Sequence, residues 1–197
     1  MKKLLALGLS LVLAGCASVA RVDSGDRAVG ERLVLHLDGA WNQIDAPGIG
    51  PAQVWTMEGL PIDQLLVYSG IKDGEAINAS GRSVASNSGS PSRKAFNFRS
   101  TMQPDEIVSL FEGMLTRDGS VFKLTKLEPA KFGGDKGFHF DYSLTRKVDN
   151  VELSGVGYGT VDKGQLYAIV YLAPRLTFFP RYKASVERIV RSARLKG

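Results

Sequence analysis

The stretch Phe138-His-Phe-Asp-Tyr-Ser-Leu-Thr145 and the later stretch Gln165-Leu-Tyr-Ala-Ile-Val-Tyr-Leu172 decide the fold. In the first, apolar and polar side chains alternate with a period of two, which predicts a strand with one buried face. In the second, both sets of alternate positions are apolar, which predicts a strand buried on both faces. Residues 151–161 lie between them, bounded by turn signals at 149–150 and 162–164. The sequence therefore predicts a three-stranded meander with a further layer on each side.

Two helices are expected to supply these layers. The first is predicted over residues 104–118, because Pro104 suits a first helical turn and Asp105 and Glu106 complement the positive end of the helix. The second is predicted over residues 180–195. The two buried stripes comprise Ile107, Val108, Phe111, Met114 and Leu115, and then Tyr182, Val186, Ile189, Val190 and Ala193. The outer face of the second helix carries Arg181, Lys183, Arg188, Arg191 and Arg194.

Four shorter extended segments precede the first helix, at residues 32–37, 41–44, 53–57 and 64–69. Together with the meander they indicate an α+β class. The expected architecture is an antiparallel β-sheet of about five to seven strands with the helices packed on it, similar to an αβα sandwich. A single domain is expected over residues 31–197.

The N-terminus has the pattern of an export signal. Lys2 and Lys3 precede an apolar run over residues 4–13, which is too short to span a membrane. The sequence Leu13-Ala14-Gly15-Cys16 then resembles the lipobox of bacterial lipoproteins. That resemblance implies cleavage after residue 15, a diacylglyceryl group on Cys16, and a fatty acid such as palmitate on the new amine. The alternative is an ordinary signal peptide with a chance cysteine.

The predicted destination is the cell envelope. Ala17 follows the lipobox where an aspartate would favour inner-membrane retention, so the resemblance implies a lipid anchor in the outer membrane, facing the periplasm. Residues 16–30 are small, polar and charged, which predicts a flexible tether between lipid and domain. No second apolar run is long enough to span a membrane.

Composition restricts the class of partner. Loss of the two lysines in residues 1–15 lowers the formal net charge from +5 to +3. This mild excess gives no argument for nucleic acid as a partner, and none is expected. Cys16 is the only cysteine, so no intrachain disulfide can form.

Three segments are candidates for interaction. The Ser-rich segment 78–94 predicts a long loop that is either a passive insertion or a binding loop carrying Arg82, Arg93 and Lys94. Phe178 and Phe179 precede the second helix and either cap the core or form an exposed anchor for a partner. The basic helix face, represented by Arg188 and Arg191, is either solvated or in contact with anionic lipid or an acidic partner.

No catalytic, metal or cofactor site is predicted. His36 and His139 lie in strand patterns without the close ligand spacing that a metal requires. The glycine run Gly155-Val-Gly-Tyr-Gly159 lies within a strand, so it lacks the helix start of a phosphate loop. It indicates close approach of a helix or an aromatic ring, or alternatively a shallow ligand groove.

Residues 96–195 resemble the fold shared by the photosystem PsbP proteins, the Ran-binding Mog proteins and DcrB-type lipoproteins. The resemblance rests on the helix at 104–118, the strand Gly137-Phe-His-Phe-Asp-Tyr142, the glycine-bearing return strand, the strand Leu166-Tyr-Ala-Ile-Val-Tyr171 and the closing helix. It implies a non-enzymatic domain that stabilises or docks onto another protein.

The expected function is therefore that of a membrane-anchored accessory lipoprotein which binds another envelope protein. Two alternatives stay open. One is a periplasmic carrier of a small ligand or lipid, with a pocket lined by Phe138, Phe140 and Tyr158. The other is a hydrolase with an unrecognised site.

Overall fold

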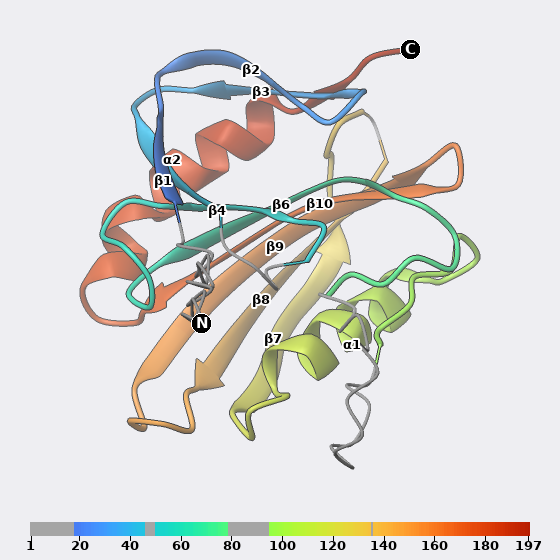
Figure 1. The fold of residues 1–197 in the computed structure, drawn as a ribbon. Helices are drawn as coiled ribbons and strands as arrows, with labels where there is room; N and C mark the ends of the chain where they lie inside the picture. Colours follow the sequence, from blue (N-terminus) through green and yellow to red (C-terminus); the bar gives the residue numbers. More distant parts are fainter. Residues whose placement is uncertain (1–17, 46–49, 79–94, 135) are drawn as a thin grey trace, which may run out of the picture.

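A computed structural model describes residues 18–45, 50–78, 95–134 and 136–197 (Figure 1). The strands of the described chain are β1 (Ser18–Val22), β2 (Gly25–Val29), β3 (Leu33–Leu37), β4 (Trp41–Asp45), β5 (Gln53–Thr56), β6 (Gln64–Ile71), β7 (Val121–Pro129), β8 (Phe138–Thr145), β9 (Glu152–Asp162), β10 (Gln165–Pro174) and β11 (Arg194–Leu195). The two helices are α1 (Pro104–Leu115) and α2 (Phe178–Ser192).

The strands form two antiparallel sheets. The large sheet has eight strands in the order β1-β4-β5-β6-β10-β9-β8-β7, and the small sheet has the order β11-β3-β2. The predicted meander is confirmed as β8, β9 and β10. The predicted range of five to seven strands is too low, because β1 and β2 lie in the expected tether and the two-residue β11 follows α2.

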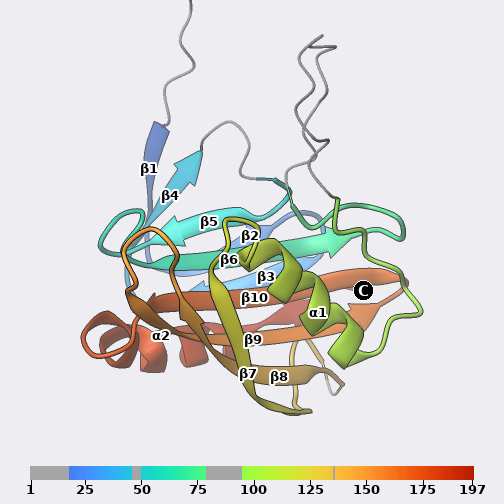
Figure 2. The same cartoon turned by 90° about the horizontal axis from the view of Figure 1, so that it is seen from below.

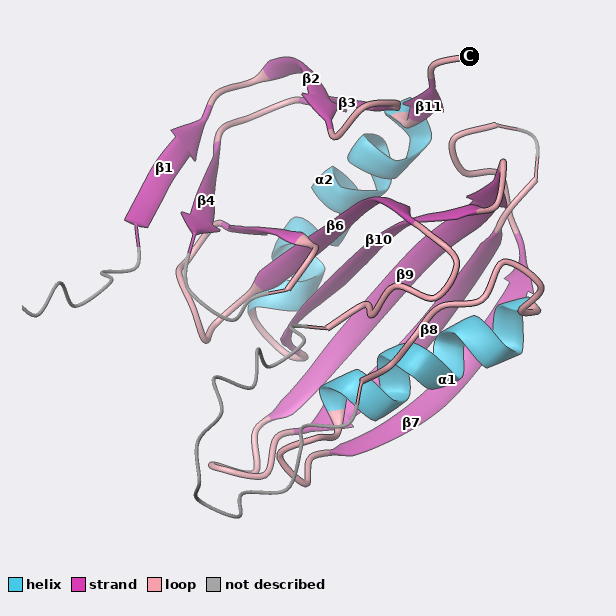
Figure 3. Cartoon of the chain, turned by 45° about the vertical axis from the view of Figure 1, so that its right-hand side comes forward, coloured by secondary structure: helices cyan, strands magenta, loops and turns pink. Residues whose placement is uncertain are grey.

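Strand β10 separates two cores, as its two apolar faces predict. Leu166, Ala168, Val170 and Leu172 belong to the core under α1, whereas Tyr167, Ile169, Tyr171 and Ala173 belong to the core under α2. The helices therefore lie on opposite faces of the large sheet, as Figure 3 shows.

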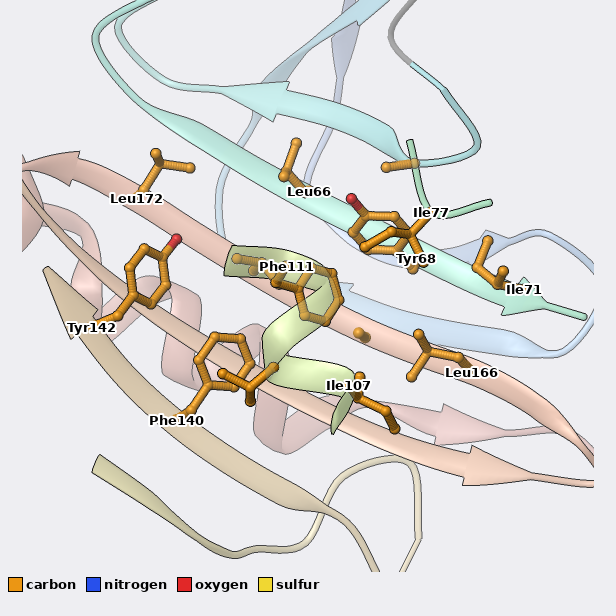
Figure 4. Packing of buried hydrophobic residues seen from close by; sticks show 14 of the residues in the cluster. Leu66, Tyr68, Ile71, Ile77, Ile107, Phe111, Phe140, Tyr142, Leu166 and Leu172 are labelled. Atoms are coloured by element: carbon orange, nitrogen blue, oxygen red, sulfur yellow. The ribbon is translucent and has the colours of Figure 1, made fainter. Parts of the chain in front are cut away.

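The α1 core is built from aromatic rings laid over glycines. Phe140 on β8 stacks on Phe111 of α1 with ring centroids 5.9 Å apart, and both side chains are buried (Figure 4). Cross-strand register pairs Phe138 with Gly159, Phe140 with Gly157, and Tyr142 with Gly155. At each glycine a Cβ would come within 2.7 Å of its partner's ring. The glycines therefore leave room for aromatic rings to lie on the strand. Of the interpretations left open by the sequence, this is the close approach of a ring rather than the shallow ligand groove.

The α2 core includes the small sheet. Val186, Ile189 and Val190 of α2 are buried together with Leu33, Leu35 and Leu37 of β3 and the indoles of Trp41 and Trp55. The carbonyl of Arg32 accepts a hydrogen bond from the backbone N–H of Lys196 at 2.9 Å, which joins β3 to the chain end after α2. Burial of β3 against α2 makes this three-stranded sheet part of the core.

The tether predicted over residues 16–30 is wrong from Ser18 onward. β1 pairs with β4 over five register positions, and β2 pairs with β3 over five more. Most side chains of β1 and β2 are exposed, and for that reason the composition of this segment resembles that of a linker. Val22 and Val29, however, are buried in the α2 core. Figure 2 shows β1 and β4 running together away from the other strands of the large sheet.

Both predicted helices form, with shifted ends. α1 ends at Leu115 rather than at residue 118, because the backbone of Thr116 leaves the helical conformation (φ −100°, ψ 6°) after its N–H has donated to the carbonyl of Glu112. α2 begins at Phe178, before Pro180, because proline is tolerated throughout the first turn. α2 ends at Ser192 because Ala193 turns to an extended conformation that leads into β11.

Candidate functional site

Four predicted site residues, Cys16, Arg82, Arg93 and Lys94, lie outside the described residues, as does most of the Ser-rich segment. The others lie on α2. Phe178 and Phe179 are half-buried against the α2 core. Phe179 stacks on Tyr171 with centroids 5.9 Å apart, and the Arg181 guanidinium lies 5.2 Å from the centre of the Phe178 ring. These contacts place the two rings within the domain, where they complete its core.

The basic face of α2 is matched by carboxylates. Arg181 pairs with Glu58 at 3.3 Å, and Lys183 and Arg191 both pair with Glu187 at 3.8 Å. Arg188 pairs with Asp38, and Arg194, which lies on β11 after the end of α2, pairs with Asp26. Each of these cations has an acidic partner, so the face is an ion-pair network that joins α2 to the small sheet and to the turn after β5. It offers less free positive charge than the sequence suggests.

His139 is a nearly buried, fully partnered histidine. Its Nδ1 lies 3.1 Å from Glu128, its Nε2 lies 3.3 Å from Asp141, and its ring stacks on Tyr158 at 4.5 Å. A hydrogen bond from Lys126, and then one from His139, lower the pKa of Glu128. Burial raises the pKa of Tyr158 to about 12. Within the described residues, no cluster of His, Cys, Asp and Glu has an arrangement that could hold a metal ion.

The pocket expected for a carrier does not form as predicted. Phe138 and Phe140 face the α1 core, whereas Tyr158 lies against the α2 core on the opposite face of the sheet. Strict alternation explains this, because Tyr158 is one residue away from the glycines that the rings cover. A groove of about 470 Å³ lies beside Phe138, between the start of α1 and the end of β7, but it does not include Phe140 or Tyr158.

Most of the strongly exposed large apolar side chains of the described residues lie at one end of the large sheet. The antiparallel register places several strand ends together at this end of the sheet. The start of β7 lies opposite the end of β8, with Val121 opposite Thr145, and the end of β8 lies opposite the start of β9. The end of β10 lies opposite the start of β6. We call the turns at this end the turn rim: residues 57–63, 116–121, 146–151 and 175–177. The orange turn between β8 and β9 marks it in Figure 1.

Hydrogen bonds join these turns into one surface. The Arg146 guanidinium donates to the carbonyl of Pro61 at 2.8 Å, and the Lys147 backbone N–H donates to the hydroxyl of Ser120 at 3.0 Å. The Arg175 backbone N–H donates to the carbonyl of Glu152 at 3.0 Å. Arg146 is itself held by two hydrogen bonds to Asp149, at 2.9 and 2.6 Å, which raise the pKa of Arg146.

Each turn of the rim presents one exposed apolar side chain. The exposed fractions are 42% for Leu60, 65% for Val121, 82% for Val148 and 82% for Leu176. These are four of the six large apolar side chains that are strongly exposed in the described part of the chain. Single exposed apolar residues are ordinary, but several gathered on one surface indicate an interaction site.

A small cavity lies between three turns of the rim. Its volume is about 160 Å³, and its lining is partly apolar and partly polar: Leu115, Leu144, Leu153, Leu172, Pro61 and Ile62, with Gln64, Asp118, Ser120 and Arg146. A cavity of about 150 Å³ is large enough for a benzene ring. Exposed apolar side chains on turns that also line a cavity with leucine side chains and a fixed arginine suit recognition of a partner's aromatic or aliphatic side chain.

Sequence reasoning missed the turn rim. Val148 and Leu176 are single apolar residues within turns, each preceded by a basic residue, Lys147 and Arg175. An apolar residue in a polar turn is the local signal that could have identified them. Nothing in the sequence shows that the four turns lie at the same end of one sheet.

The architecture belongs to the class of antiparallel sheets with two packed helices. Comparison with solved structures finds similarity to the cyanobacterial PsbP (CyanoP) of Synechocystis sp. PCC 6803, with a TM-score of 0.56 and 14% identity over 98% of this chain and 99% of that chain. LpqN of Mycobacterium tuberculosis, described as involved in cell envelope biogenesis, matches with a TM-score of 0.47 and 12% identity over 92% of each chain. Comparison with family models and with curated proteins finds no match. The PsbP-like fold expected from the sequence is thereby confirmed.

Within the described residues, neither helix has the length and apolar character needed to cross a membrane.

Proposed function

We propose that this chain is a lipid-anchored accessory protein of the cell envelope, without enzymatic activity, which docks onto another envelope protein through the turn rim. The observation that carries the proposal is the presence of the exposed side chains Leu60, Val121, Val148 and Leu176 on the turn rim, where three of the four turns also line a cavity. The lipobox at residues 13–16 supports the anchor, and the likeness of the fold to cyanobacterial PsbP is consistent with an accessory role. In this proposal the anchor lies in the outer membrane and the domain faces the periplasm.

The docking surface is tested by site-specific photo-crosslinking in the native host. A photoreactive amino acid at Val148 or Leu176 is expected to give a discrete adduct, whereas the same residue at Lys196, which lies outside the rim, is expected to give none. With the crosslinker at Val148, Leu176→Glu is expected to weaken docking roughly 30-fold, since central apolar contacts each contribute about 2 kcal/mol.

The matched control is Leu124→Glu, an equally polar change at an exposed apolar residue of β7 outside the rim. It is expected to leave the Val148 adduct unchanged. Adducts of equal yield from Lys196 and Val148, or a Val148 adduct that survives Leu176→Glu, would contradict docking through the rim.

The anchor is tested by intact mass and membrane fractionation of the wild type and Cys16→Ser. The wild type is expected to gain a mass that corresponds to a diacylglyceryl group on the Cys16 sulfur and one acyl chain on the new amine, and to sediment with outer membranes. Both properties are expected to disappear in Cys16→Ser, because the thiol is the attachment point. Several acyl chains at about 0.8 kcal/mol per buried methylene give a stable anchor. A soluble wild type without added mass would exclude lipidation.

A further inference from the structure

The first strand begins almost at the proposed lipid attachment point. Cys16 and Ser18 are two residues apart, and Ser18 is the first residue of β1. Two residues of fully extended chain span at most about 7 Å. From Ser18 onward the chain is paired with β4, beginning with Ser18 opposite Asp45. Little free chain therefore separates Cys16 from the folded domain.

β1 is held to the domain by burial of its last residue and by the strand that follows it. Val22, its last residue, is buried in the α2 core opposite the buried indole of Trp41. The chain then enters β2, where Val29 is completely buried. Detaching β1 to create a longer tether would expose Val22 and break its pairing with β4, so the short connection is a stable property of the fold.

The free end of β1 has an apolar side. Val19 is 64% exposed, and its register partner Ile44 is half-buried. The two side chains lie side by side across β1 and β4 because directly opposite residues project from the same face. Apolar side chains beside an acyl anchor can enter the boundary between headgroups and acyl chains.

We infer that the β1–β4 end of the large sheet is a lipid-facing surface, which the acyl chains on Cys16 hold directly against the bilayer, so that the domain has one fixed orientation on the membrane. This inference rests on the proposed lipid anchor. It adds that the anchor fixes the orientation of the domain on the membrane. A tether over residues 16–30 would have an r.m.s. length of roughly 20 Å and leave the domain free to turn.

Fluorescence quenching by lipid-attached nitroxides tests the orientation. Because Cys16 is the only cysteine and is acylated in the mature protein, a single engineered cysteine takes a thiol-reactive fluorophore selectively. The lipidated full-length protein is placed in phosphatidylethanolamine and phosphatidylglycerol vesicles with headgroup nitroxides. The label is carried either at Asp45→Cys, opposite Ser18, or at Gly197→Cys. Figures 1 and 3 show the C-terminus on the far side of the molecule from β1.

Strong quenching is expected at Asp45→Cys and none at Gly197→Cys. Inserting about 12 Gly and Ser residues between Ala17 and Ser18 adds a reach of roughly 20 Å and is expected to remove most of the quenching at Asp45→Cys. The same insert appended after Gly197 is the matched control and is expected to change nothing. Circular dichroism checks that each variant keeps its sheet.

Equal quenching at the two sites, or quenching at Asp45→Cys that is unaffected by the N-terminal insert, would overturn the fixed orientation while leaving the anchor intact. Protein that lacks the lipid mass and does not float with the vesicles would overturn the proposed anchor, and this inference with it. Intact mass and flotation are measured on the same samples, so the two failures are distinguishable.

Discussion

Gly157→Ala is expected to lower the free energy of unfolding by about 2–3 kcal/mol, at the upper end of the usual cost of overpacking a core. A Cβ at Gly157 would stand 2.1 Å from two atoms of the Phe140 ring. That ring is completely buried and stacked on Phe111 of α1, so it has no free space to move into. Accommodating the methyl group requires α1 or β9 to shift.

Urea unfolding followed by circular dichroism measures this effect. The matched control is Gly39→Ala, where a Cβ would have no heavy atom within 4 Å and the backbone is not in the left-handed region. The control is expected to be as stable as the wild type. Gly157→Ala combined with Phe140→Leu is expected to recover part of the loss, because contacting residues couple. If Gly157→Ala and Gly39→Ala unfold at the same urea concentration, the ring does not require the glycine.

Deletion of residues 17–30 is expected to cost about 3–6 kcal/mol, which approaches the whole stability of an ordinary domain. The deletion removes the buried Val22 and Val29, each worth about 1.5–3 kcal/mol. It also uncovers Trp41, which faces Val22, and Leu33, which faces Val29. Loss of β1 and β2 further leaves β4 and β3 as new unpaired edges.

The reference for this deletion is a chain that begins at Ala17, which keeps both strands. The shorter chain is expected to unfold at a much lower urea concentration or to aggregate, whereas a true tether could be removed without effect. Identical urea midpoints and near-ultraviolet spectra for the two chains would show that β1 and β2 do not contribute to the fold.

The sequence by itself determined the centre of the molecule. The period-two alternation of Phe138–Thr145, the doubly apolar Gln165–Pro174 and the two helical stripes predicted the meander, the helices and the layer on each face. The glycine run indicated that rings approach the sheet there, and Phe138, Phe140 and Tyr142 fill that role. These features can be predicted from the sequence because the buried face of a strand or helix in a large core appears as a regular repeat of apolar residues.

Only the tertiary structure decided the periphery. β1 and β2 are polar edge strands whose pairing depends on partners elsewhere in the chain, so their composition resembles that of a linker. The carboxylates that neutralise α2 come in part from Asp38 and Glu58, which are distant in sequence. The turn rim exists because antiparallel register brings four separate turns to one end of a sheet. Register is a long-range property that local periodicity does not encode, and the surface proposed for docking depends on it.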